Sequence, residues 1–528
     1  MPDPAPEPRS RRARLVDWSY RLFPLLLLPV LLLVSRDYGN TWDEKIHQIN
    51  GETVWQFWKG TPVPAAHPTI ELYGALFDFL CVAVQHVVPG DSWTTRHYVN
   101  AVFGWLGILF TGRLAALLFG RGAGLLAMAL LTLCPRYLGH AMNNPKDVPF
   151  AALWVAALYF LARMEPRPPY LRWRSLLGFA LAAALALNVR AGALLLLGFL
   201  GVGLTVAALR AHAGSLLSLW QVAGRWTGAA LFVLVFGTVL WPWALVRPLS
   251  GPFVALEQLS KFRWKGSVLF DGVLVPARSL PWSYVPTWTA IALPPALLAG
   301  AVLSLRRLRV RADAWACAGL WAATAFPVAY VMARHSTLYN GLRHLLFVLP
   351  TLVVLAAAGW TALLGAMHGW PRRLAVATLV LGLAEPALFC FRNHPNEVVY
   401  FSPLIGGPRG AFGRFDMDYW GNCVLQEVQW ADRLARRSGV PLVVSGQPPH
   451  VVQIDAGRFD SLSSAGPEQG LHHLEIAPVW GPRSEVSSAL ARGDVLHWVS
   501  TSDGAVLCIT TKGPRFAEVA ASLKPASR

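Results

Sequence analysis

Long runs of hydrocarbon side chains constrain this chain more than any other feature of its sequence. The first run is "LFPLLLLPVLLLVS" at residues 22–35, and comparable runs recur as far as residue 391. A bilayer span requires about 17 to 25 mostly apolar residues. Only 14% of the side chains are charged, against roughly a quarter in soluble domains. The sequence therefore predicts an all-α, polytopic membrane domain over residues 1–391.

The positive charge lies mainly in short arginine clusters between the apolar runs. The formal net charge is +17, but clusters such as "RRAR" at 11–14 and "RRLRVR" at 306–311 are typical of cytoplasmic loops that orient helices. We therefore predict no nucleic-acid partner. If every cluster is cytoplasmic, about eleven transmembrane helices follow. Their expected bounds are near 20–35, 98–118, 122–137, 148–163, 175–189, 192–209, 226–243, 284–304, 313–332, 344–364 and 373–391.

This orientation places the N-terminus in the cytoplasm and the C-terminus outside it. The protein is then a multi-pass protein of the inner or plasma membrane, with membrane lipids around it. The basic N-terminal segment lacks a small-residue cleavage site, so we expect no signal peptide. The apolar segment 68–88 would add one crossing and break the alternation. Because its Glu71 and Asp78 share a helix face, we expect a helix on the outer membrane surface.

The first outer loop, "RDYGNTWDEKIHQ", follows directly after the first apolar run. Thr41 and Glu44 have the spacing of a capping box, which predicts that Glu44 is a structural cap. Asp43, in the second helical position, would be stabilised by the helix dipole. The alternative for Asp43 is catalytic, because a carboxylate here can act as the general base for an acceptor hydroxyl. One carboxylate suffices for inversion when the leaving group is a phosphate, unlike the pair used in glycoside hydrolysis.

A second group of polar residues, "NNPKDVPF", opens another span on the same side. Asp147 fits a helix N-cap, with Pro149 in the first turn. Lys146 opposes the helix dipole unless a phosphate binds beside it. We therefore predict a donor phosphate site formed by Lys146, Arg190 and Arg343, although an arginine at this level can also be a simple interfacial anchor.

The histidines and carboxylates give no clear metal pattern. No H-x-x-x-H or paired-cysteine spacing is present, so no dedicated metal site is predicted, and His344 is expected to be an ordinary hydrogen-bonding residue. A divalent cation shared by Asp43 and Asp147 stays open as a cofactor. Lys146 beside Asp147 favours neutralisation of the phosphate by side chains instead.

In combination, these features resemble the GT-C superfamily of polyprenyl-phosphate-sugar-dependent glycosyltransferases. The resemblance rests on "TWDE", on "HP" at His67 and Pro68, on "NNPKD", and on the later runs "YNGLRHLLFVLP" and "HPNEVVYFSPLIGGPRGAFGRFDMDYWG". It is strongest to a bacterial subgroup of the branch that holds protein O-mannosyltransferases and lipid A aminoarabinose transferases. It implies a GT-C type fold and a polyprenyl-phosphate-linked sugar donor. It also implies that Asp43 is the catalytic base and Asp147 a second catalytic acid, supported by Glu44, His67 and His344.

Residues 392–528 contain no run long enough for a span. The segment "QEVQWADRLARRSG" predicts a helix ended by glycine, and "VPLVVSG", "DVLHWVST" and "GAVLCITT" predict strands. We expect a small extracytoplasmic α/β domain that could recognise the acceptor or cover a cavity. Cys423 and Cys508 could form a disulfide if this domain lies outside the cytoplasm.

The leading hypothesis is a membrane hexosyl- or pentosyltransferase that inverts the anomeric centre. It would move a sugar from the lipid carrier to a hydroxyl of an unidentified lipid, glycan or protein. A flippase or exporter of lipid-linked sugars is one alternative, but it needs polar residues along the spans, which are apolar at mid-membrane. A non-catalytic membrane scaffold is the other, and it leaves Asp43 without a chemical role.

Overall fold

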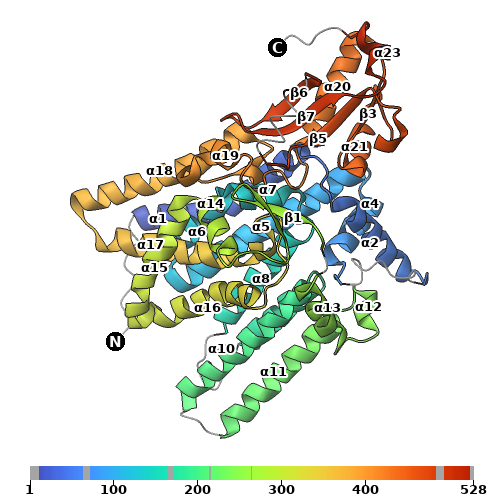
Figure 1. Ribbon diagram of the computed structural model, residues 1–528. Coiled ribbons are helices and arrows are strands. Elements are labelled where there is room, and N and C mark those ends of the chain that lie inside the picture. Colours follow the sequence, from blue (N-terminus) through green and yellow to red (C-terminus); the bar gives the residue numbers. More distant parts are fainter. Residues whose placement is uncertain are drawn as a thin grey trace.

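The computed structural model describes residues 11–62, 72–164, 172–212, 216–262, 264–482, 491 and 493–523 (Figure 1). Helices dominate as far as residue 393, because an apolar backbone segment in lipid must satisfy its own hydrogen bonds. The helices of this part are α1 (Arg11–Val34), α2 (Glu44–Phe57), α4 (Leu76–Val87), α5 (Ser92–Phe119), α6 (Arg121–Thr132), α7 (Pro135–Asn143), α8 (Asp147–Ala162), α9 (Trp173–Leu187), α10 (Leu194–His212), α11 (Leu216–Phe236), α12 (Pro242–Leu245), α13 (Gly251–Ser260), α14 (Tyr284–Ala292), α15 (Pro295–Ser304), α16 (Arg311–Ala333), α17 (Leu349–Ala366) and α18 (Gly369–Asn393).

Each expected span coincides with a helix or a pair of helices, but a count of about eleven crossings is not confirmed. In the described part of the chain, five helices are long and apolar enough to cross a membrane. The number is seven if two bent pairs, α6 with α7 and α14 with α15, each count as one span. The bends are 69° and 115°. Both coincide with prolines that begin the second helix, at Pro135 and Pro295, where a proline cannot continue the preceding helical hydrogen bonds.

Small residues allow the membrane helices to pack closely. A Cβ atom on Gly359 of α17 would lie 2.0 Å from the carbonyl oxygen of Gly300 in α15. Such an approach is typical of helix pairs in membranes, where packing rather than hydrophobicity drives association. In Figure 1, α10 and α11 extend as a pair away from the terminal sheet.

The predicted surface helix 68–88 is shorter than expected. Residues 63–71, which include Glu71 and His67, lie outside the described residues, and the helix that follows is α4, with 12 residues. This length is too short for a bilayer span. Its Asp78 is buried, and it accepts a hydrogen bond from Arg96 Nη2 at 3.1 Å and pairs with His47 Nδ1 at 2.7 Å. These contacts fix α4 against α2 and α5.

The end of the chain forms a mixed sheet with helices packed on it. The remaining elements are β1 (Ser267–Phe270), β2 (Val273–Pro276), the 3₁₀ helix η4 (Arg343–Val348), α19 (Gly407–Ala411), α20 (Val424–Ser438), β3 (Leu442–Gly446), α21 (Pro449–Ala456), β4 (Leu462–Ser464), β5 (Leu474–Pro478), β6 (Val495–Ser500), β7 (Val506–Lys512) and α23 (Phe516–Ala520). β1 and β2 form a separate antiparallel hairpin, and the five-stranded sheet has the order β4-β3-β5-β7-β6. β3 is parallel to β4 and β5, while β7 is antiparallel to β5 and β6.

The predicted helix and three predicted strands of this terminal part are confirmed as α20, β3, β6 and β7. α20 ends at Gly439, whose φ of +68° suits glycine. Cys423 and Cys508 are buried next to each other as free thiols, so the disulfide considered from the sequence is not formed in this structure. Figure 1 places the sheet beyond α7, on the side opposite α10 and α11.

Candidate active site

Asp43 lies immediately before α2, which begins at Glu44. The expectation that Asp43 is the second residue of a helix is therefore wrong, and its side chain makes no capping hydrogen bond. Glu44 does reach back as predicted, because its Oε2 accepts from the backbone N–H of Thr41 at 2.8 Å. Glu44 also pairs with His97 Nε2 at 3.1 Å. Since Glu44 carries the local structural bonds, the carboxylate of Asp43 is left for other partners.

The partners of Asp43 are two cations from distant parts of the chain. Its Oδ2 lies 3.4 Å from Lys146 Nζ and 3.5 Å from Arg343 Nη1. Both cations are almost completely buried, whereas a quarter of the Asp43 side chain is exposed. The carboxylate therefore sits at the accessible edge of a buried positive site.

The protonation of Asp43 reflects this position. Burial alone would raise the pKa of its carboxyl group, but the charges of Lys146 and Arg343 outweigh burial and hold the pKa well below the usual 3.8. Burial lowers the pKa of Lys146, but Asp43 together with Tyr73 and Tyr339 outweighs burial, so the pKa of the ammonium group is raised. At neutral pH the site therefore contains one carboxylate and two cations.

Asp147 is the first residue of α8, and it is buried. The prediction that it is the N-cap is wrong, because Asn144 Oδ1 accepts from the backbone N–H groups of Lys146 and Asp147 at 3.2 and 3.0 Å. The Asp147 carboxylate instead pairs with Arg190 Nη2 at 2.8 Å and accepts from Asn144 Nδ2 at 2.9 Å. Asp147 thus holds Arg190 and the second outer loop.

Aromatic rings separate the cations and fix their orientation. Tyr73 lies under both Lys146 and Arg190, with 4.5 Å from Nζ and 5.9 Å from Cζ to the ring centroid. Arg343 lies between Tyr339 and Trp420, with its Cζ at 4.8 and 4.7 Å from the two ring centroids. Cations held over aromatic faces keep their donors available for an incoming anion.

The structure thus brings five of the predicted site residues together, namely Asp43, Lys146, Asp147, Arg190 and Arg343. His344 follows Arg343 and packs on the edge of the Tyr339 ring, with 4.5 Å between the ring centroids. Its Nδ1 has no partner in the described part of the chain. His67 lies outside the described residues.

A cavity of about 330 Å³ reaches this cluster at Arg343, which is one of its lining residues. Its walls come from α7, α14, α16, η4 and α17 and are mainly apolar. The polar groups in its lining are few, and they are Arg136, His140, Thr289, Thr324, Arg343 and Tyr419. A pocket with long apolar walls and a cationic end suits a ligand with a hydrocarbon chain and an anionic headgroup.

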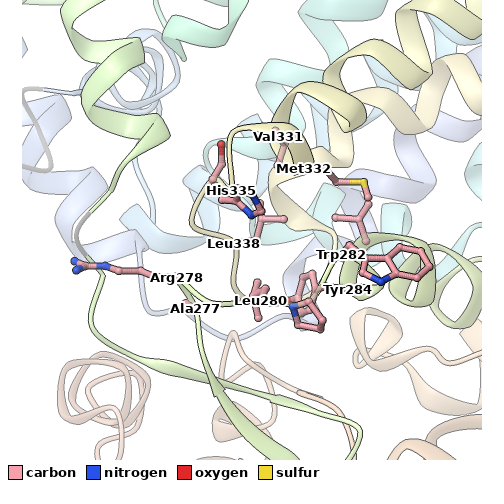
Figure 2. A pocket seen from close by; sticks show the side chains of 12 residues that line it. Ala277, Arg278, Leu280, Trp282, Tyr284, Val331, Met332, His335 and Leu338 are labelled. Atoms are coloured by element: carbon pink, nitrogen blue, oxygen red, sulfur yellow. The ribbon is translucent and has the colours of Figure 1, made fainter.

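A smaller pocket of about 60 Å³ adjoins this cavity and shares Val285 and Met332 with it (Figure 2). The segment after β2 and the end of α16 line it. In Figure 2, the Arg278 side chain points away from the other labelled side chains, so the pocket itself is mainly aromatic and aliphatic. Its lining also includes Arg278 and His335.

Several residues of the site had no signal in the sequence. His140 Nε2 is 3.0 Å from the Tyr419 hydroxyl, and its Nδ1 accepts from Trp420 Nε1 at 3.1 Å. Asn422 Oδ1 accepts from the backbone N–H of Gly39 at 3.2 Å and from Asn143 Nδ2 at 3.1 Å. These contacts join segments that are almost 400 residues apart in one case, so no local pattern could have indicated them.

The residues present do not fit a divalent cation. Within the described ranges, no three His, Cys, Asp or Glu side chains converge on one point. Each of the two carboxylates that could have shared an ion is faced by a lysine or arginine instead. A positive surrounding opposes a second positive charge, so we assign no step to a metal.

Residues 76–245 match a family model described as dolichyl-phosphate-mannose-protein mannosyltransferase. This match confirms the resemblance to polyprenyl-phosphate-dependent glycosyltransferases over the segment that holds Lys146, Asp147 and Arg190. Asp43 and Arg343 lie outside the matched segment. No curated protein matches the chain.

Solved structures with a similar overall course come from bacterial and archaeal proteins. ArnT from Cupriavidus metallidurans in the apo state is similar with a TM-score of 0.48 and 15% identity, covering 97% of this chain and 100% of that chain. The same protein bound to undecaprenyl phosphate gives 0.46 and 15%, covering 96% and 99%. The oligosaccharyltransferase AglB from Archaeoglobus fulgidus, with an inhibitory peptide and a dolichol-phosphate, gives 0.47 and 12%, covering 87% and 70%. These likenesses are distant.

Proposed function

We propose that the protein is an inverting glycosyltransferase that takes a sugar from a polyprenyl-phosphate carrier and transfers it to an acceptor hydroxyl on the extracytoplasmic side. The observation that carries this proposal is the apolar cavity that ends at Arg343, the guanidinium that also contacts Asp43 at 3.5 Å. A prenyl chain in the cavity would bring its phosphate to the cations and its sugar to the carboxylate. The family model match supports the same reaction class.

Lys146 and Arg343 stabilise the leaving group in this proposal. As the bond between the anomeric carbon and the phosphate oxygen breaks, its electron pair goes to that oxygen, and negative charge grows there. Two buried cations in a low-dielectric site are worth more than the same cations in water, and they favour the transition state. Because the phosphate leaves as an anion, no general acid is required.

Asp43 is the proposed general base. The acceptor hydroxyl attacks the anomeric carbon on the face opposite the phosphate, and this direction of attack inverts the configuration. Asp43 accepts the proton of the hydroxyl. A carboxylate with a depressed pKa is a weak base. A donor phosphate that draws Lys146 and Arg343 toward itself would raise the pKa of Asp43, so donor binding would activate the base.

Asp147 supports the reaction in this proposal without touching the acceptor proton. It holds Arg190 at 2.8 Å, which is the third cation near Tyr73. Glu44 and His344 support the first loop and the Arg343 segment.

The test is a transfer assay with the purified full-length protein in nanodiscs. It is supplied with several radiolabelled polyprenyl-phosphate hexoses and pentoses and with a cell-envelope extract as acceptor. We expect one donor to release free polyprenyl phosphate and to give a product of inverted anomeric configuration. Translocation of intact donor across sealed vesicles without release would support a flippase, and neither activity with any donor would support a scaffold.

A further inference from the structure

Arg136 of α7 is a buried arginine without a counterion. It is 3% exposed, and its guanidinium lines the apolar cavity that also contains Arg343. Its Nε donates to the carbonyl oxygen of Tyr400 at 3.0 Å. In the described part of the chain, its Nη1 and Nη2 make no hydrogen bond of ordinary length and angle, the Tyr419 hydroxyl is a neutral acceptor that faces them, and no described carboxylate lies within ion-pair distance.

A purely structural role explains only part of this arrangement. The guanidinium stacks on Trp288 and Phe401, with its Cζ at 5.2 and 4.7 Å from the ring centroids, and these contacts tie α7 to α14 and to residues 400–401. The stacked faces and Nε account for that role. The two terminal amino groups do not take part in it, and an arginine cannot lose its charge to escape burial. Leaving such donors unpaired in an apolar wall is costly unless a ligand pairs with them.

The unpartnered groups nearby are uncharged, and they include the hydroxyl of Tyr284. The indole Nε1 of Trp288, under the guanidinium, is buried without a partner. The uncharged Tyr419 hydroxyl is the main polar neighbour of Arg136, and it hydrogen-bonds to His140. Because the polar neighbours of Arg136 are uncharged hydroxyl and indole groups, its positive charge is not balanced, and the missing partner is an anion and not a cation.

The anion site is continuous with the cluster around Asp43. His140 hydrogen-bonds to both Tyr419 and Trp420, and Trp420 stacks against Arg343. Of these residues, His140, Tyr419 and Arg343 line the same cavity as Arg136. A phosphate is suited to a guanidinium fork, which can donate two parallel hydrogen bonds to it.

We infer that Arg136 is a further phosphate-binding residue, which contacts the phosphate of the polyprenyl carrier in addition to Lys146 and Arg343. This inference rests on the proposed function, because it assigns the cavity to the carrier. Arg343 and Arg136 then hold the same phosphate from two directions, before and after the sugar leaves. Neither the arginine clusters nor the matched motifs of the sequence assign this role to Arg136.

The experiment measures binding of three probes to the full-length protein in nanodiscs: polyprenyl phosphate, the corresponding neutral polyprenol, and inorganic phosphate. The variants are Arg136→Gln and Arg136→Lys, and Arg414→Gln is the control, because Arg414 forms an exposed pair with Asp271 and does not line the cavity. We expect Arg136→Gln to weaken polyprenyl phosphate binding on the order of ten- to a hundredfold, the usual range for charge-assisted hydrogen bonds. Polyprenol binding should stay unchanged, and Arg136→Lys should recover part of the loss.

Three results would overturn the inference. The first is an unchanged affinity of Arg136→Gln for polyprenyl phosphate. The second is an equal loss of affinity for polyprenol, which indicates a damaged cavity, and the third is binding of inorganic phosphate that depends on Arg136 and is as tight as binding of the lipid. If Arg136→Gln does not fold, Arg136→Lys carries the comparison. Parent protein that binds no polyprenyl phosphate would refute the proposed function itself, whereas parent-like binding and transfer by Arg136→Gln would refute only the role of Arg136.

Discussion

Replacement of Asp43 by asparagine should separate chemistry from structure at this site. Asparagine keeps the size of the side chain but cannot accept a proton at neutral pH. A positioned general base contributes roughly a hundredfold or more to turnover, which is about 3 kcal/mol of barrier. We therefore expect Asp43→Asn to lose at least about two orders of magnitude in kcat.

The cost in stability should be smaller than the cost in rate. At 3.4 and 3.5 Å from Lys146 and Arg343, each ion pair has a Coulomb energy of about 4–5 kcal/mol at an effective dielectric constant of about 20. Desolvation of the partners offsets most of this energy, and a quarter of the Asp43 side chain is exposed. A net loss of about 1–2 kcal/mol in the free energy of unfolding is expected.

Glu44 provides the matched control, because it is the next residue and also a carboxylate. Glu44→Gln keeps an acceptor for the Thr41 N–H and should retain much of the activity. Glu44→Ala leaves both that N–H and His97 without a partner, so it should lower stability by about 2–4 kcal/mol. kcat is measured by release of polyprenyl phosphate, and stability by thermal unfolding in detergent. Asp43→Asn with parent-like kcat, or Glu44→Gln as slow as Asp43→Asn, would refute the assignment of the base.

Arg343→Lys should lower donor affinity on the order of tenfold without unfolding the protein, since an ammonium cannot replace a bidentate fork; equal affinity would make Arg343 an anchor. Addition of a chelator should leave kcat unchanged. Loss of activity with the chelator and its recovery on addition of Mg²⁺ or Mn²⁺ would contradict neutralisation of the phosphate by lysine and arginine side chains. The acid partners Asp37 and Glu397 outweigh burial and raise the pKa of His394 to about 9. Its contribution to stability is therefore complete below about pH 6.5 and lost as the pH rises through about 9, whereas His394→Gln should lack this dependence in thermal unfolding. Cysteines introduced at Lys59 and Gln447 should both react with an impermeant reagent in intact cells, and protection of both would reverse the proposed sidedness.

The membrane helices were predictable because lipid leaves the backbone few alternatives. An apolar run of sufficient length has to be a helix, and the run lengths located α5, α16 and α17 closely. The bends between α6 and α7 and between α14 and α15 were not predicted, because a proline marks where a helix can break and not how far the next one turns. β4 and β5 were also missed. β4 has three residues, too few for a pattern to stand out from the loops around it, and β5 contains an alanine and a proline, which are uncommon in strands, among its five residues.

The candidate site likewise contains residues that the sequence predicted and residues that it did not. Asp43, Lys146 and Asp147 lie in polar loops between apolar runs, so their contrast with the surrounding sequence marked them. Arg136 lies in the second outer loop, as Lys146 does, and both side chains are positively charged. Nothing in the sequence, however, distinguishes Arg136 from an interfacial anchor. Its burial depends on Trp288 and Tyr400, which reach it only through the tertiary fold.

Hydrogen bonds and an aromatic contact hold the terminal domain to the loop that carries Asp43. Asn40 Nδ2 donates to Asp455 Oδ1 at 2.7 Å, and the carbonyl oxygen of Trp42 accepts from His450 at 3.0 Å. The Trp42 ring also packs against Trp480, with 5.6 Å between the centroids. Without residues from α21 onward, these groups on either side of Asp43 lose their partners, and the carboxylate loses its fixed distance to Lys146 and Arg343. A truncated chain should therefore be inactive whether or not the terminal domain touches the acceptor. Only point substitutions on its exposed surface, away from these contacts, can reveal a role in acceptor recognition.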